Sequence, residues 1–256
     1  MGTPVAVTSF SRKLYESYAH RLIASAAKWP TRISIYSEDK LPFAHVDLNR
    51  VCPKLAAFQA KCPPAPSYHF DAARFATKVF AFCHAAWNAD DLVFWLDADI
   101  VMHEQITIEF LRGLLPEGFY AGYFGREGLY TETGFHMVDA RHPANRAFLE
   151  EFRKVYLDGT IFRLPQWHDC MAYDFVREQF EQAGVKFHNL SGEFSNHPHP
   201  IVMSPLGEFL DHTKGPNRKR QGYSHERLSQ RSAVLGDVER PNPGMEGRVP
   251  GAVAEL

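Results

Sequence analysis

One short segment, residues 91–102, constrains the fold of this chain more than any other. Its sequence, DLVFWLDADIVM, is apolar except for three aspartates. An apolar run of this length is typical of a strand whose two faces are both covered. Asp97 and Asp99 lie two residues apart, so a continuous strand would project both carboxylates to the same side. Close carboxylates repel each other and are costly to bury, which predicts a cationic partner beside them.

The segments around this run alternate between strand and helix patterns. β-type patterns occupy residues 4–10, 31–39, 119–124, 134–140 and 185–190, and amphipathic patterns predict helices over 14–26, 70–87, 142–159 and 168–184. The chain opens with the order strand, helix, strand, which is typical of an open and mostly parallel sheet. The sequence therefore predicts the α/β fold class with a mostly parallel central sheet.

Length and composition favour one domain followed by a tail. The chain has 256 residues, of which 45% are hydrophobic, so it can form a sizeable core. Beyond about residue 220 it becomes rich in Gly, Pro and charge, so we expect a single domain over 1–220 and a polar, flexible tail over 221–256. The formal net charge of -2 gives no electrostatic basis for binding nucleic acid.

The expected location is the cytoplasm. The N-terminal residues lack a signal-peptide pattern, and no run approaches the roughly 18 apolar residues of a membrane span. Peripheral contact with a membrane remains open. A disulfide between Cys52 and Cys62 is possible, but reduced thiols are favoured for the four cysteines.

A divalent cation is the partner that best explains Asp97 and Asp99. Carboxylate oxygens are ligands that Mg²⁺ and Mn²⁺ prefer, and the carboxyl end of a central strand is where open α/β sheets bind ligands. The alternative is that the strand ends at Leu96 and the aspartates belong to a solvated turn. Against that alternative, the apolar run resumes at once with Ile100.

The segment LVFWLDADIVM resembles the D-x-D strand of GT-A glycosyltransferases. In that family two aspartates hold a Mn²⁺ or Mg²⁺ that is bound to the diphosphate of a nucleotide sugar. The resemblance implies a Rossmann-like α/β/α sandwich, with a nucleotide-binding half over about 1–102 and an acceptor half over about 103–220. It also implies that Asp97 and Ala98 contact the donor and that Asp97 and Asp99 are metal ligands.

A second segment, DHTKGPNRK, strengthens this resemblance. His212, Gly215 and Arg218 are spaced like the H-x-x-G-x-x-K motif of the glycogenin-like and lipopolysaccharide-galactosyltransferase-like enzymes. The resemblance makes His212 the third metal ligand and places Gly215 against the diphosphate. Arg218 stands where lysine is usual, so Lys214 or Lys219 could share the neutralisation of the diphosphate.

Other donor-binding candidates follow from their positions before or after strands. Arg74 and Lys78 share one face of the helix that precedes the aspartates, where they could reach phosphates or remain solvent-facing. Thr8 and Ser9 end the first strand, and Glu38 or Asp39 ends the second, so they could line the base and ribose site. The alternative for these last residues is a role in turns.

Two segments carry the catalytic candidates. The first, Glu132-Thr133-Gly134, resembles the segment that carries the donor sugar; Glu132 is a candidate catalytic residue, and Thr133 and Gly134 are donor-binding candidates. The second contains Trp167, an apolar plate for a sugar, with His168 and the catalytic candidate Asp169. The alternative for His168 or Asp169 is capping of the helix that follows.

The sequence thus predicts a metal-dependent glycosyltransferase that moves a hexose from a nucleotide sugar to an acceptor hydroxyl. The resemblance favours a UDP-sugar, a glycan, lipid-linked or protein acceptor, and, slightly, retention over inversion at the anomeric carbon. One alternative is a sugar nucleotidyltransferase or a metal-dependent phosphohydrolase that uses the same aspartates. Another is a non-catalytic protein that binds nucleotide sugars.

Overall fold

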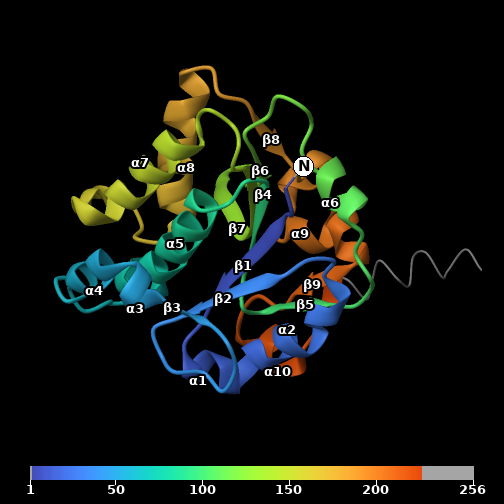
Figure 1. Cartoon of the computed structure of the whole chain (residues 1–256), viewed down its shortest axis with the longest axis horizontal. Coiled ribbons are helices and arrows are strands. Elements are labelled where there is room, and N and C mark those ends of the chain that lie inside the picture. Colours follow the sequence, from blue (N-terminus) through green and yellow to red (C-terminus); the bar gives the residue numbers. More distant parts are fainter. Residues whose placement is uncertain (1, 227–256) are drawn as a thin grey trace, which may run out of the picture.

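A computed structural model describes residues 2–226 of the chain (Figure 1). Within this part a seven-stranded sheet has the order β3-β2-β1-β4-β7-β6-β8, and β5 and β9 form a separate two-stranded sheet. The strands are β1 (Val5–Ser9), β2 (Ile33–Ser37), β3 (Val46–Asp47), β4 (Leu92–Leu96), β5 (Ile100–Met102), β6 (Ala121–Arg126), β7 (Leu129–Asp139), β8 (Phe187–Asn189) and β9 (Leu210–His212). Strands β3, β2, β1 and β4 run parallel, as do β6 and β8, whereas β7 is antiparallel to both of its neighbours. The predicted α/β fold class with a mostly parallel sheet is confirmed.

Helices cover both faces of this sheet. They are α1 (Arg12–Leu14), α2 (His20–Ser25), α3 (Leu48–Val51), α4 (Pro53–Gln59), α5 (Ala72–Trp87), α6 (Ile108–Gly113), α7 (Asn145–Leu157), α8 (Asp169–Gln182), α9 (Pro200–Met203) and α10 (Pro216–Gln221). In Figure 1, α3, α4, α5, α7 and α8 lie on one side of the sheet, and α2, α6 and α9 lie on the other. The result is a three-layer α/β/α arrangement.

Side chains of β4 explain why the chain needs both helical layers. Val93 and Trp95 pack into the core shared with α5, α7 and α8, whereas Leu92, Phe94 and Leu96 pack into the core shared with α2, α6 and α9. All five side chains are buried, and burying each one stabilises the fold by about 1.5–3 kcal/mol. Apolar and polar residues therefore do not alternate along β4, because each face of this strand packs against an apolar core.

The continuous strand predicted through Asp97 and Asp99 is wrong. Strand β4 ends at Leu96, and a turn closed by a hydrogen bond from the Ile100 amide to the Asp97 carbonyl (3.0 Å) follows. The chain then starts β5, which pairs with β9, so Ile100 lies opposite His212. The turn is only partly solvated, because 30% of the Asp97 side chain is exposed but only 6% of Asp99 is. Apolar side chains therefore resume after the turn because a second small sheet buries them.

Most other predicted elements are present with altered ends. The helix predicted over 14–26 is interrupted by a π-helical turn, η1 (Tyr15–Ala19). Shorter 3₁₀ segments are η2 (Ala26–Lys28), η3 (Tyr68–Phe70), η4 (Thr160–Arg163), η5 (Gly192–Asn196) and η6 (Pro205–Glu208). All four cysteines carry free thiols. Among the described residues, none of the helices combines the length and apolar character needed to cross a membrane.

Most of the segment expected to form a tail, residues 227–256, lies outside the described residues. The residues just beyond 220 pack on the domain: Ser224 is fully buried, and its amide donates to Asp211 (2.7 Å). Its hydroxyl also donates to the carbonyl of His212 (3.0 Å). The residues after α10 therefore hold β9 in place.

Candidate active site

Asp97, Asp99 and His212 converge at the carboxyl edge of the parallel strands. One potential ligand atom from each of them lies within 4.8 Å of the others. The Nε2 atom of His212 is 3.3 Å from Asp99 Oδ1 and 3.8 Å from Asp97 Oδ2. The turn after β4 supplies the two aspartates, and the pairing of β5 with β9 brings His212 across from them. Residues more than a hundred positions apart thus form one cluster.

The ring of His212 lies directly against the backbone of Gly134 in β7. A Cβ atom at position 134 would be only 2.4 Å from His212 Cε1 and less than 3 Å from both ring nitrogens. The Gly134 carbonyl also accepts a hydrogen bond from the Asp97 amide (2.9 Å). Gly134 therefore positions two of the three converging residues, one by its carbonyl and one by its lack of a side chain.

This cluster fits a divalent cation in its donor chemistry. Two carboxylates and an imidazole nitrogen suit Mn²⁺, and the carboxylates also suit Mg²⁺. The Nδ1 atom of His212 is buried and has no hydrogen-bond partner among the described residues, so Nε2 is the nitrogen that faces the carboxylates. Burial lowers the pKa of His212, but the nearby Asp99 carboxylate and its hydrogen bond outweigh burial and raise that pKa.

Two lysines neutralise the aspartates. Lys78 of α5 lies 2.8 Å from Asp97 Oδ1, and Lys219 of α10 lies 2.9 Å from Asp99 Oδ2. Burial raises the pKa of Asp99, but the charge and hydrogen bond of His212, followed by those of Lys219, outweigh it and lower the pKa. These contacts stabilise two adjacent carboxylates that would otherwise repel each other.

Lys78 also joins Asp97 to Asp169, the first residue of α8. Its Nζ lies 2.7 Å from Asp169 Oδ2 and donates to the Thr133 carbonyl (2.7 Å). The Thr133 hydroxyl donates to the same Asp169 carboxylate. Burial opposes ionisation of Asp169, but the Lys78 charge outweighs burial and lowers the pKa of this carboxyl. The helix cap predicted for His168 or Asp169 belongs to His168, whose Nδ1 accepts from the Met171 amide (3.3 Å).

Glu132 forms a second buried group of charges on β7. Its carboxylate pairs with Lys214 and with Arg126, whose Nη1 lies 3.2 Å away. Burial opposes ionisation of Glu132, but the charges of Lys214, His212 and Arg126 lower its pKa to about 2. The loop of Lys214 and Gly215, which was predicted to contact the donor diphosphate, is thus linked to the predicted catalytic residue Glu132 by the Lys214–Glu132 ion pair.

Arg218 does not point toward the aspartates. It pairs instead with Glu226, with 3.2 Å between Arg218 Nε and Glu226 Oε2, and it donates to the Lys214 carbonyl (3.2 Å). Gly215, with φ of 85°, precedes α10 in a conformation that favours glycine. The conformation at Gly215 and the Arg218–Lys214 bond fix the turn of the loop, while Lys219 is the residue of this motif that reaches Asp99.

Several predicted donor-binding residues have other partners in the structure. Glu38 accepts hydrogen bonds from Gln59 (2.7 Å) and Thr77 (3.2 Å), and Arg74 stacks on Tyr68 (5.5 Å). The ring of Trp167 packs edge-on against Phe70 and Phe162 in the apolar core. Thr8 is buried with no hydrogen-bond partner for its hydroxyl among the described residues, Ser9 is half-buried, and Ala98 is buried.

Two aromatic side chains near the aspartates were not predicted to take part in the site. One contacts an aspartate, and the other contacts a lysine that pairs with an aspartate. The indole of Trp95 donates to Asp97 Oδ1 (2.6 Å), which gives an apolar strand residue a polar role. Lys219 Nζ lies 4.4 Å from the ring centroid of Tyr18, in the π-helical turn, and makes a cation–π contact with it. The pattern of β4 contained a signal for the first, because a buried tryptophan needs a partner for its N–H. No local pattern indicated the second.

The fold and this site define an α/β protein with a carboxylate–histidine cluster at the carboxyl edge of its sheet. The sequence matches no protein-family model and no curated protein. Among similar solved structures is the galactosyltransferase LgtC in complex with donor and acceptor sugar analogues (15% identity, 93% of this chain and 97% of that chain, TM-score 0.48). Others are a glycosyltransferase involved in glycosylation of the major capsid of PBCV-1 (12%, 86% and 98%, 0.46) and mouse xyloside xylosyltransferase 1 (12%, 80% and 94%, 0.44). At these sequence identities and TM-scores, the structural similarity does not support an assignment of function. The function is therefore inferred from the side chains of the site.

Proposed function

We propose that this chain is a metal-dependent glycosyltransferase of the GT-A type. The observation that carries the proposal is the convergence of Asp97, Asp99 and His212 at the carboxyl edge of the parallel strands. A divalent cation held by these residues would supply Lewis-acid neutralisation of a diphosphate leaving group. The remaining charged residues then act on the sugar and on the phosphates through their own atoms.

The cations around the cluster support binding of a diphosphate. Lys78 and Lys219 touch the two aspartates, and Lys214 is partly exposed beside Glu132. If a cation binds Asp97 and Asp99, the ammonium groups of Lys78 and Lys219 would become available to pair with phosphate oxygens. A site that combines carboxylates with several lysines is suited to a dianionic leaving group.

Asp169 is the residue that we expect to face the reacting sugar. Its side chain is only 3% exposed, is paired with Lys78, and has a lowered pKa, so it is a weak base for an acceptor proton. A fixed carboxylate of this kind is better suited to stabilising positive charge on the anomeric carbon. This reasoning favours retention of configuration, in which the leaving diphosphate accepts the acceptor proton.

The finer assignments follow the resemblance described for the sequence. We propose a UDP-sugar as donor, a hydroxyl of a glycan, lipid-linked or protein acceptor, and manganese as the cation. We also propose a single catalytic domain over residues 1–220, with a nucleotide-binding half over about 1–102 and an acceptor half over about 103–220. We also propose a cytoplasmic location.

A panel of nucleotide sugars tests this proposal. The full chain is incubated with each donor, with and without Mn²⁺, and the nucleotide product is identified by chromatography. Release of nucleoside diphosphate that depends on Mn²⁺ is expected for at least one donor. The matched control is Asp99→Asn, which keeps the size of the side chain but removes a charged ligand.

Other products would identify other functions. Release of nucleoside monophosphate would indicate a phosphohydrolase, and formation of a nucleotide sugar from a sugar phosphate and a nucleoside triphosphate would indicate a nucleotidyltransferase. Binding of a nucleotide sugar with no turnover of any donor would leave a binding protein and would contradict the transferase proposal.

A further inference from the structure

A polar groove of about 310 Å³ lies where the β6–β7 hairpin meets α8 and β8. Its lining includes Arg126, Glu127, Leu129, Asp174, Arg177 and Asn189. None of the metal-ligand candidates and neither predicted catalytic residue lines it. A volume of this size is at the lower end of the range for small-molecule sites, about 300–1,000 Å³.

Two parallel hydrogen-bonded pairs relate this groove to the proposed reaction centre. Thr133 of β7 donates to Asp169 of α8, and Thr131 donates to Asp174 through its amide (2.7 Å) and its hydroxyl. Asp169 and Asp174 are five residues apart on one helix, which corresponds to about 7.5 Å along its axis. Thr131 and Thr133 are separated by about 7 Å along the strand. Thr131 and Asp174, which line the groove, therefore lie about 7 Å along the strand and the helix from the pair formed by Thr133 and Asp169.

Arg126 connects the groove to the charges of the site. It lines the groove, and its Nη1 pairs with Glu132, which in turn pairs with Lys214. The Arg126 side chain is only 6% exposed, and its Nη2 has no hydrogen-bond partner within residues 2–226. The Nε and Nη1 atoms of Arg126 donate to the carbonyls of Tyr130 and Pro198, so Nη2 is its one nitrogen whose hydrogen-bonding capacity is unused within the described residues.

The chemistry of the lining points to a ligand rich in hydroxyl groups. Asp174 and Arg177 pair with each other (3.1 Å), so the groups most open to a ligand are the exposed carboxylates of Glu127 and Glu178 and the exposed Asn189 amide, which offer acceptors and donors. Leu129, which is 55% exposed, offers an apolar surface. The two guanidinium groups are outnumbered by the three carboxylates of Glu127, Asp174 and Glu178. This balance disfavours a phosphate or a uronate, because neither would find a surplus of positive charge.

We propose that this groove binds an uncharged sugar residue of the acceptor. The proposal rests on the proposed function, since it supplies the substrate that receives the transferred sugar. The acceptor hydroxyl lies toward Asp169, and the adjoining sugar residue occupies the space between the hairpin and α8. The groove then selects a neutral glycan as the acceptor.

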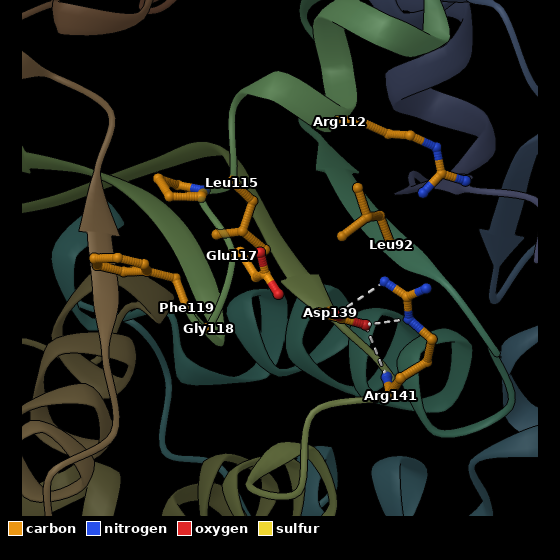
Figure 2. A pocket seen from close by; sticks show the side chains of 9 residues that line it. Leu92, Arg112, Leu115, Glu117, Gly118, Phe119, Asp139 and Arg141 are labelled. Atoms are coloured by element: carbon orange, nitrogen blue, oxygen red, sulfur yellow. Dashed lines mark hydrogen bonds and ion pairs between the residues drawn. The ribbon is translucent and has the colours of Figure 1, made fainter. Parts of the chain in front are cut away.

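A second cavity supplies a matched control. It measures about 180 Å³ and lies at the opposite edge of the sheet, where β4 begins and β7 ends (Figure 2). In Figure 2, Arg141 reaches back to Asp139 (2.9 Å), and Glu117 lines the other wall. Both of its arginines are already paired, Arg112 with Asp91 and Arg141 with Asp139, and it shares no residue with the groove. Glu117 is an exposed carboxylate, as are Glu127 and Glu178.

Direct binding is measured first, by saturation-transfer NMR on the full chain with methyl glycosides of glucose, galactose and N-acetylglucosamine. Glucuronic acid and glucose 6-phosphate serve as charged probes. At least one neutral glycoside is expected to bind, and the double variant Glu127→Ala/Glu178→Ala should weaken that binding by about 3- to 10-fold, the effect of losing one or two hydrogen bonds. Glu117→Ala should leave it unchanged.

Transfer kinetics give the second measurement. With the glycoside that binds as acceptor, the double variant should raise the acceptor KM and lower the ratio of transfer to donor hydrolysis. Absence of binding by every neutral probe, equal binding by the double variant, or preference for a charged probe would each overturn the proposal. Binding in the groove without turnover of any donor would instead overturn the proposed function, and the groove would then be a binding site for neutral sugars and not an acceptor site.

Discussion

Replacement of Gly134 by alanine is expected to disable the proposed metal site while leaving the fold in place. The new Cβ would lie 2.4 Å from His212 Cε1, and an ordinary contact begins at 3.4 Å, so the ring must move by about 1 Å. His212 cannot retreat freely, because it is fully buried within β9 and its strand is paired with β5. Overpacking of this kind costs about 1–3 kcal/mol of stability.

The larger effect should fall on the affinity for manganese. A ring moved by about 1 Å would change the 3.3 Å separation between His212 Nε2 and Asp99, so the three ligand atoms would no longer converge as they do. Misplaced ligands typically lower metal affinity by about 10- to 100-fold. Isothermal titration of the full chain with MnCl₂, in the presence of a nucleoside diphosphate, measures this change, and circular dichroism checks that the fold remains.

A matched control is Gly113→Ala at the end of α6. A Cβ atom at position 113 would meet nothing within 4 Å, so this change should be neutral or stabilise the chain by up to about 1 kcal/mol. Wild-type manganese affinity in Gly134→Ala would refute the idea that contact with the glycine backbone positions His212. An equal loss of affinity in both variants would show that the effect is not specific to position 134.

Three further predictions concern the charged groups. Asp99→Asn should abolish manganese-dependent binding of a nucleoside diphosphate while far-UV circular dichroism stays unchanged; unaltered calorimetric affinity would remove Asp99 from the ligand set. Lys78→Met should cost about 3–5 kcal/mol in urea unfolding, because it leaves the Asp169 and Asp97 carboxylates without their shared cation, and adding Asp169→Asn should recover part of the loss. Burial opposes ionisation of Asp91, but hydrogen bonds from Arg112 and the Leu92 amide lower its pKa, so its stabilisation is present above the ordinary pKa near 3.9 and is lost as pH falls through the lowered one. The stability difference between wild type and Asp91→Asn should therefore be about 1.5–3 kcal/mol at pH 7 and shrink below pH 4; an equal difference at pH 7 and pH 2 would contradict it.

The elements that the sequence predicted well are those whose signal is local. The apolar run of β4 and the amphipathic pattern of α5 each depend on burial of neighbouring residues, and both elements are present. The break after Leu96 was predicted only as the alternative, because Asp97 and Asp99 fit an extended strand as well as they fit a turn. What decides between the two is the pairing of β5 with β9, which joins residues more than a hundred positions apart.

The contacts of the candidate site residues also divide into those that a sequence motif predicts and those that only the packing of distant segments determines. The motif spacing placed His212 near the aspartates, and the structure brings these residues together. The motif spacing did not reveal that Arg218 pairs with Glu226 or that Glu132 pairs with Arg126. Any of several cations could have satisfied each carboxylate, and only the packing of distant segments selects among them.

Under the proposed function, the lysine contacts of the two central aspartates predict that cation and nucleotide assist each other's binding. Lys78 and Lys219 already balance the negative charge at Asp97 Oδ1 and Asp99 Oδ2. A cation that binds the opposite oxygens, which face His212, must therefore replace the two ammonium groups as the counter-charge of these carboxylates. A diphosphate offers those lysines new anionic partners, which lowers the cost of this exchange. We therefore expect heterotropic cooperativity, in which manganese tightens nucleotide binding and the nucleotide tightens manganese binding by the same factor.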